Sequence, residues 1–271
     1  MAVGGQAQKG GELLSFVPLD GGHGIKIIDR IERRHLTIET TGPVQPEDTS
    51  TDEFAFPVDE AVNVETDRIF VPDELCVVVW NSLGFMIAEI TGDETRELPK
   101  DRYVFEIPGP IRLYVTVDAP CSVDMSGEGV LIESDIPTEV TIGARSYHKQ
   151  PAATITTPER VEDLMEAISY FGSGLKTTSC ERSYPSHRGH PPTLEVGEGL
   201  EVSSVLTRPE TGVTIEVPRN LESVFTVATL AYYLGAEVVP GETPRIVTEG
   251  GFIHSLDSPT TTFEEEVERV L

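Results

Sequence analysis

Lysine is scarce in this 271-residue chain, and the scarcity is informative. Five lysines and 15 arginines stand against 46 acidic residues, so the net charge is -26. A surface rich in carboxylates and poor in lysine stays hydrated at multimolar salt, where screening shortens the Debye length to about 3 Å. The composition therefore predicts a halophilic, acidic protein. The alternative, an acidic disordered chain, conflicts with the 38% of hydrophobic residues, which occur in periodic runs.

The shortage of basic residues also excludes several partners. Nucleic-acid binding needs clustered Lys and Arg to replace phosphate counter-ions, and no stretch concentrates them on that scale. No apolar run approaches the roughly 20 residues that cross a bilayer, and the first residues lack the apolar core of a signal peptide. We therefore expect a cytoplasmic protein that binds neither nucleic acid nor a membrane.

Cysteine is equally sparse. Cys76, Cys121 and Cys180 are odd in number and far apart in the sequence. This spacing does not indicate a disulfide framework, and we expect all three thiols to be reduced.

The pattern of the chain changes character near residue 150. Before it, short β-branched and aromatic runs recur about every ten residues, separated by Pro, Gly and Asp, which is typical of an antiparallel β-sandwich or jelly roll. In the run 111–117, Ile111, Leu113 and Val115 alternate with Tyr114 and Thr116, which predicts one packed face and one wet face. Residues 1–150 are therefore predicted to form a β-sandwich domain.

Turn signals add detail to this domain. The segment 81–84 links two apolar runs and predicts a hairpin loop. The segment 41–53 has almost no apolar content and two prolines, which predicts a mobile surface loop.

Helical periodicity begins after residue 150. The spacing predicts a helix over 158–171 with Thr157 as its N-cap. A strand over 212–218, a helix capped by Asn220 and ended by Gly235, and a strand over 236–239 follow. The segment 244–256 predicts a hairpin. Residues 151–271 are therefore predicted to form a small α/β domain. Because a capped helix after Thr262 begins an apolar stripe and stops at Leu271, we expect this domain to continue beyond residue 271.

The segment most suited to recognition is 176–192, KTTSCERSYPSHRGHPP, which we call the basic loop. It reverses the sign of an otherwise acidic chain. Guanidinium forks that persist in such a chain suit a carboxylate or phosphate, either of a ligand or of the protein's own surface. An internal role, in which the arginines tie the two domains together by ion pairs, stays open as the alternative. The predicted ligand-binding residues are Lys176, Arg182, Tyr184, His187, Arg188 and His190.

The basic loop also holds a weak metal pattern. Cys180, His187 and His190 form C-x6-H-x2-H, which could supply three zinc ligands and leave a fourth position for water. The paired C-x2-C of structural zinc sites is missing, so two exposed histidines and a buried free thiol are the expected arrangement. We predict no cofactor and identify no catalytic residue.

Three stretches carry a resemblance to known proteins. These are FAFPVDEAVNVETDRIFVP (54–72), the continuous stretch 156–192 that ends in the basic loop, and LAYYLGAEVVPGETPRI (230–246). Together they resemble an uncharacterised family of haloarchaeal proteins that has no established activity. The resemblance implies a halophilic source and a chain that continues past residue 271, and it implies no catalytic residue.

Two functions remain after these observations. The first is non-catalytic recognition or scaffolding within a larger haloarchaeal protein, which would bind an anionic ligand or a protein partner through the basic loop. The alternative is an enzyme, either a metal-dependent hydrolase using Cys180, His187 and His190 or one whose catalytic domain lies beyond residue 271. The pattern indicates no particular oligomeric state.

Overall fold

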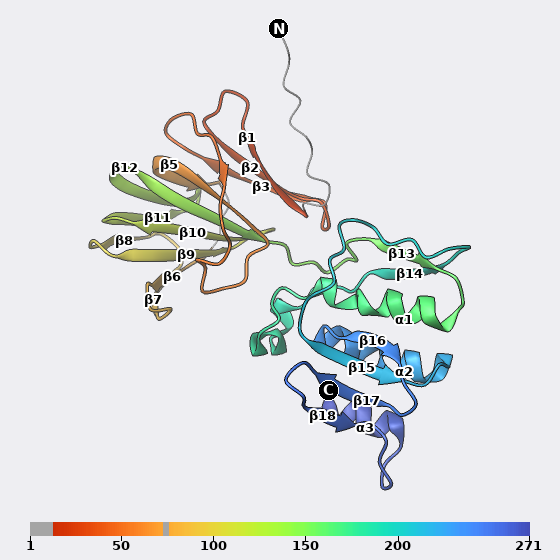
Figure 1. Cartoon of the computed structure of the whole chain (residues 1–271). Helices are drawn as coiled ribbons and strands as arrows, with labels where there is room; N and C mark the ends of the chain where they lie inside the picture. Colours follow the sequence, from red (N-terminus) through yellow and green to blue (C-terminus); the bar gives the residue numbers. More distant parts are fainter. Residues whose placement is uncertain (1–12, 73–75) are drawn as a thin grey trace. The chain divides into compact units, whose positions relative to one another are not determined.

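The computed structural model of the chain describes residues 13–72 and 76–271. The first 12 residues of the predicted β-sandwich domain therefore lie outside the described residues. The described chain divides into two compact units, Leu13–Tyr147 and His148–Leu271, which are considered separately (Figure 1). The first is an antiparallel β structure and the second a small α/β unit, which confirms the predicted fold class.

The β unit contains a network of antiparallel strands around one core. Two long strands, β5 and β12, pair along most of their lengths, with a register shift between Glu133 and Thr138. The first part of β12 pairs with β11 and the last part with β10, so one long pair joins two groups of strands. The strands are β1 (Leu14–Pro18), β2 (Gly24–Asp29), β3 (Arg34–Glu39), β4 (Glu47–Asp48), β5 (Glu60–Val71), β6 (Val77–Asn81), β7 (Met86–Ile90), β8 (Glu94–Leu98), β9 (Arg102–Pro108), β10 (Arg112–Asp118), β11 (Cys121–Ser126) and β12 (Gly129–Arg145).

The outer face of β10 is covered, and the prediction that it is wet is wrong. Tyr114 is fully buried and Thr116 is 6% exposed. Phe56 stacks on Tyr114 with ring centroids 5.6 Å apart, and Phe54 meets the same ring edge-on at 6.4 Å. Alternation along a strand reports which residues share a face. It does not report that a segment nearly 60 positions earlier in the chain covers the second face.

The predicted turns of the β unit are partly confirmed. β6 and β7 form a hairpin in which the Asn81 side chain accepts hydrogen bonds from the amides of Leu83 and Phe85. The segment 41–53 is less open than predicted, because β4 lies within it and pairs with β5, and Val44 is buried in the core.

The α/β unit is built around a four-stranded sheet in the order β16-β15-β17-β18. β15 and β16 are parallel and joined by α2 (Figure 1). The buried face of α2 shares one hydrophobic core with the sheet. A separate parallel pair, β13 and β14, flanks α1. The elements are β13 (Thr154–Thr157), α1 (Val161–Ser169), the 3-10 helices η1 (Phe171–Gly174), η2 (Cys180–Ser183) and η3 (Pro185–His187), β14 (Thr193–Val196), β15 (Val213–Val217), α2 (Leu221–Leu234), β16 (Glu237–Pro240), β17 (Arg245–Thr248), β18 (Ile253–Ser255) and α3 (Phe263–Val270).

The ends of α2 and α1 show where local capping rules succeed and where they fail. The Asn220 side chain accepts a hydrogen bond from the Ser223 amide, and Gly235 ends α2 in the left-handed conformation at φ 62°, both as predicted. The predicted N-cap of α1 is wrong: the cap is Arg160, with no side-chain hydrogen bond. Thr157 is held instead in β13, where it pairs with Val196, and the proline that follows it favours extended backbone.

The end of the chain forms the predicted capping box. In α3, the Thr262 side chain accepts from the Glu265 amide while the Glu265 side chain accepts from the Thr262 amide. The hairpin of β17 and β18 is also confirmed. Within residues 13–72 and 76–271, no helix has both the length and the apolar character that a membrane span requires.

Candidate functional site

Backbone hydrogen bonds join residues 174–176, at the start of the basic loop, to residues 187–190, near its end, and we call this part of the chain the neck. The Lys176 amide donates to the His187 carbonyl at 3.0 Å, and the Gly189 amide donates to the Gly174 carbonyl at 2.6 Å. The His190 amide donates to the His148 carbonyl at 2.7 Å. These bonds bring the two ends of the loop together, so the residues between them form a compact excursion whose base is fixed.

The neck requires glycine at position 189. A Cβ there would lie 2.2 Å from His148 Nδ1 and 2.7 Å from the Gly174 carbonyl oxygen, so any larger residue would push the two ends apart. Tyr232, in the last turn of α2, donates its hydroxyl to the Gly189 carbonyl at 2.5 Å. This bond ties the neck to the helix, and burial raises the pKa of the Tyr232 hydroxyl while Arg188 opposes the shift.

The two short 3-10 helices shape the excursion. Ser179 caps η2 by accepting a hydrogen bond from the Glu181 amide. Arg182 Nη1 donates to the Thr178 carbonyl at 2.6 Å, which uses one end of its guanidinium fork within the loop. Pro185 opens η3, where its fixed φ suits the first helical position.

Two arginines of the basic loop share one aromatic ring. The Cζ atoms of Arg182 and Arg188 lie 5.8 Å and 5.7 Å from the ring centroid of Tyr233, which is the neighbour of Tyr232 in α2. Both arginine side chains are half-buried. Within the described residues neither guanidinium forms an ion pair with a carboxylate. Two positive charges therefore meet on one tyrosine without an acidic partner, in a chain with 46 acidic residues.

A third arginine in the same unit shows the contrasting arrangement. Arg208 lies over the ring of Tyr170 at 5.9 Å, which is the same stacking contact. It also pairs with Glu237 at 3.3 Å and lies 3.8 Å from Glu166. The α/β unit therefore supplies carboxylates to one stacked arginine and, in its described part, none to the pair on Tyr233.

The other predicted ligand residues make separate contacts within the loop and at its neck. Tyr184 is 61% exposed and meets the His187 ring edge-on at 5.7 Å. His187 Nδ1 lies 3.2 Å from the Glu181 carbonyl oxygen, and His190 Nδ1 lies 2.6 Å from that of Pro191. Both histidines therefore direct Nδ1 at backbone. The half-buried Lys176 is placed at the neck by its amide.

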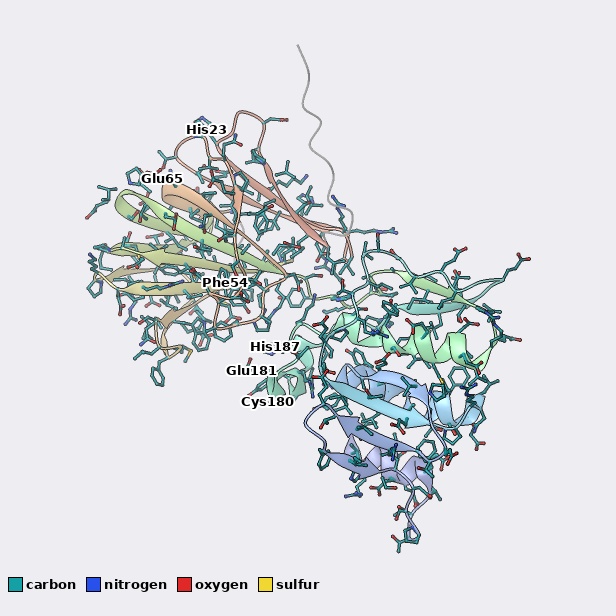
Figure 2. All side chains as sticks on the ribbon, viewed as in Figure 1. His23, Phe54, Glu65, Cys180, Glu181 and His187 are labelled. Atoms are coloured by element: carbon teal, nitrogen blue, oxygen red, sulfur yellow. The ribbon has the colours of Figure 1, made fainter. Side chains whose placement is uncertain are left out.

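The thiol and the two imidazoles are near one another in the sequence, but the structure does not group them as metal ligands. Figure 2 shows Cys180, Glu181 and His187 together on the turns of η2 and η3. Nevertheless, among residues 13–72 and 76–271 no three His, Cys, Asp or Glu side chains are grouped as metal ligands. Cys180 is exposed, so the expectation of a buried thiol is wrong, and of the two histidines only His190 is exposed while His187 is half-buried.

A buried histidine, His148, packs against the neck of the loop. His148 is 2% exposed and adopts φ 47°, a left-handed conformation that is unusual for a residue other than glycine. Burial, together with the positive charge of Lys176 and the neighbouring His190, lowers its pKa to about 3. The imidazole beneath the neck is therefore neutral at ordinary pH.

Sequence reasoning found the loop but missed the residues that hold it. Tyr232 and Tyr233 lie more than 40 positions after Arg188, near the end of the predicted helix that Gly235 terminates. His148 lies well before the loop, close to residue 150, where the pattern of the chain changes. No local pattern links these positions, and only covariation between the arginines and Tyr233 would have been a signal.

Comparison with known proteins adds no relative. A scan against protein-family models, a search of curated proteins and a search of solved structures each found no match. The chemistry of the basic loop is therefore inferred from its own geometry: a positively charged segment with free donors, whose two ends are joined by backbone hydrogen bonds.

Proposed function

We propose that the basic loop serves in recognition and binds an anionic group, of a small ligand or of a protein partner, through Arg182 and Arg188. The observation that carries the proposal is that both guanidinium groups stack on Tyr233 and neither has a carboxylate partner in the described chain. An aromatic ring holds a guanidinium in place while leaving its N–H groups directed elsewhere. The arginines are therefore oriented and still able to donate.

The internal-tie alternative predicts a different environment. Structural arginines in this chain either contact a carboxylate, as Arg208 does with Glu237, or are buried, as Arg145 is at 4% exposure. Arg182 and Arg188 are half-buried and do neither. The stacked pair contacts a tyrosine of its own unit and, for Arg182, one backbone carbonyl of its own loop. This pattern favours a surface prepared for an external anion.

The enzyme alternative gains no observation. A metal-dependent hydrolase would need Cys180, His187 and His190 to converge, and no such group occurs within the described residues. A catalytic domain beyond residue 271 concerns residues outside this sequence. Recognition is therefore the function we carry forward, and we propose that it operates in a haloarchaeal cell at high salt, as the acidic, lysine-poor composition favours.

Charge-conserving substitutions test the recognition proposal. Arg182→Lys and Arg188→Lys keep the charge but remove the bidentate fork, so each should weaken binding of small oxyanions by about tenfold. Calorimetric titrations with acetate, succinate and methyl phosphate at one fixed KCl concentration measure this effect. Arg208→Lys is the matched control, because it alters a stacked arginine that already has carboxylate partners. Equal affinities in all four proteins, or no binding by wild type, would overturn the proposal.

A further inference from the structure

The charge of the site indicates the charge of its ligand. Arg182 and Arg188 place two cations on Tyr233, and no carboxylate in the described residues neutralises either. A monocarboxylate would leave one guanidinium uncompensated. A ligand with two negative charges on one centre would neutralise both, which selects a compact dianion.

The donors of the site indicate the number of oxygens. Arg182 has one Nη committed to Thr178 and keeps the rest of its fork. The Arg188 side chain and the Tyr233 hydroxyl make no hydrogen bond with any group in the described part of the chain. Three side chains can therefore donate around one ring. A carboxylate offers two oxygens, whereas a phosphate monoester offers three terminal oxygens and close to two negative charges at neutral pH.

From this match we propose that the basic loop recognises a phosphomonoester dianion, an inference that rests on the proposed function. Arg182 and Arg188 each donate hydrogen bonds to two of the phosphate oxygens. The Tyr233 hydroxyl donates one further hydrogen bond to the phosphate. The ring of Tyr184 belongs to the same loop and is 61% exposed, so it is available to cover the organic group that carries the phosphate.

The acidic background makes the requirement for several donors stricter. The α/β unit, residues 148–271, has 19 acidic against nine basic residues, a net charge of -10, so its overall field repels anions. At molar salt this field is screened within about 3 Å, and chloride competes for any simple positive charge. A ligand that gains several directional hydrogen bonds at contact distance outcompetes chloride, and a phosphomonoester does so better than a carboxylate.

The test compares anions that differ in one property. Methyl phosphate is the dianion, dimethyl phosphate keeps the phosphorus centre with a single charge, and acetate is the monocarboxylate. Calorimetry at constant KCl should give methyl phosphate at least about tenfold tighter binding than either of the others. In wild type the order should hold, in Arg182→Lys and Arg188→Lys it should collapse, and in Arg208→Lys it should be unchanged.

The outcomes separate this inference from the proposed function. Equal binding of methyl phosphate, dimethyl phosphate and acetate, lost in both loop variants, would overturn the phosphomonoester and leave anion recognition standing. Absence of binding by all three anions would overturn both. Tyr233→Phe adds a second measurement, because it keeps the stacking ring and removes only the hydroxyl. It should weaken methyl phosphate by about threefold and acetate less, and an equal loss for both anions would count against the inference.

A peptide series identifies the source of the phosphate. A peptide with one phosphoserine is compared with two control peptides of the same sequence. One has glutamate in place of the phosphoserine (the glutamate twin), and the other has unmodified serine. Phosphopeptide binding that is tighter than methyl phosphate and is lost in the glutamate twin assigns the ligand to a phosphorylated protein segment. Affinity equal to that of methyl phosphate assigns it to a free phosphomonoester. A glutamate twin that binds as well as the phosphopeptide would overturn the inference.

Discussion

Arginine stacks on tyrosine in both units of this protein, and the Arg112 cluster of the β unit contrasts with the arginine pair of the basic loop. In the β unit, Arg112 lies 5.7 Å from the Tyr147 ring and also forms an ion pair with Glu106, whose side chain is 11% exposed. Glu106 further accepts hydrogen bonds from the Trp80 indole at 3.1 Å and from Tyr114 at 3.5 Å. Every partner of this carboxylate is a neighbouring strand residue, so the cluster is closed.

The α/β unit leaves its stacked pair open. Arg182 and Arg188 share Tyr233 and have no carboxylate within the described chain. The difference teaches that stacking alone does not show whether the charge of an arginine is neutralised. Arg112 has Glu106 as its counter-ion, whereas Arg182 and Arg188 have no carboxylate partner within the described residues.

Removing salt should have the largest effect, and it should affect the β unit first. Residues 13–147 have 26 acidic against ten basic residues, a net charge of -16, compared with -10 for residues 148–271. At about 0.1 M KCl the carboxylate repulsion is no longer screened at short range, so the folded circular dichroism present at about 3 M should be lost. An unchanged melting curve at low salt would contradict the halophilic proposal.

Breaking the closed cluster should be the most damaging single change. Glu106→Gln leaves the half-buried Arg112 without its counter-ion and should lower the free energy of unfolding by about 3 kcal/mol. The matched control is Glu133→Gln, because Glu133 and its partner Arg68 are 48% and 44% exposed and such pairs contribute about 0.5 kcal/mol. Thermal melts at high salt measure both variants. Similar losses would show that the cluster is no more important than a surface ion pair.

Acid should weaken the α/β unit through His148. Its folded pKa of about 3 lies below the ordinary 6.5, so the unfolded chain binds the proton first and stability falls as pH falls below about 6.5. Between about pH 7 and about pH 5 the loss should be about 2 kcal/mol.

His148→Asn is the matched variant for this response. Asparagine tolerates the left-handed backbone and does not titrate in this range, so melts of the variant at the two pH values should differ less than those of wild type. The same pH slope in both proteins would exclude His148 as the source.

The open pair should give the smallest stability change and the clearest functional one. Arg182→Lys and Arg188→Lys should each lower the free energy of unfolding by less than about 1 kcal/mol, because half-buried side chains without an ion pair contribute little. Their melting temperatures should stay close to that of wild type while binding of small oxyanions weakens by about tenfold. A large drop in melting temperature would return these arginines to the structural role of the closed cluster.

Sequence reasoning performed well where the determining interactions are local. Asn220 and Gly235 mark the two ends of α2, as predicted, because a cap needs only the residues next to it. The Thr262 capping box was predicted correctly for the same reason. It failed at Thr157, where pairing with Val196 outweighs the local capping signal. It also failed at Tyr114, because the covering ring of Phe56 comes from a distant segment.

The candidate site shows the same division. The reversal of charge located the basic loop and named both arginines, since composition is local information. Tyr233, which orients them, and His148, which supports the neck, were not foreseen. They are distant in sequence and adjacent only after the chain has folded.

By itself, the sequence determined the acidic composition, the succession of an antiparallel β unit and an α/β unit, and the position of the basic loop. These properties follow from composition and from periodicities of two and 3.6 residues, which every local stretch carries. The tertiary structure alone decided which charges are neutralised. Glu106 meets Arg112 because β9 and β10 pair, whereas Arg182 and Arg188 meet a tyrosine because α2 ends beside the loop. Whether a charge is satisfied or available depends on contacts between distant residues, and those contacts exist only in the folded chain.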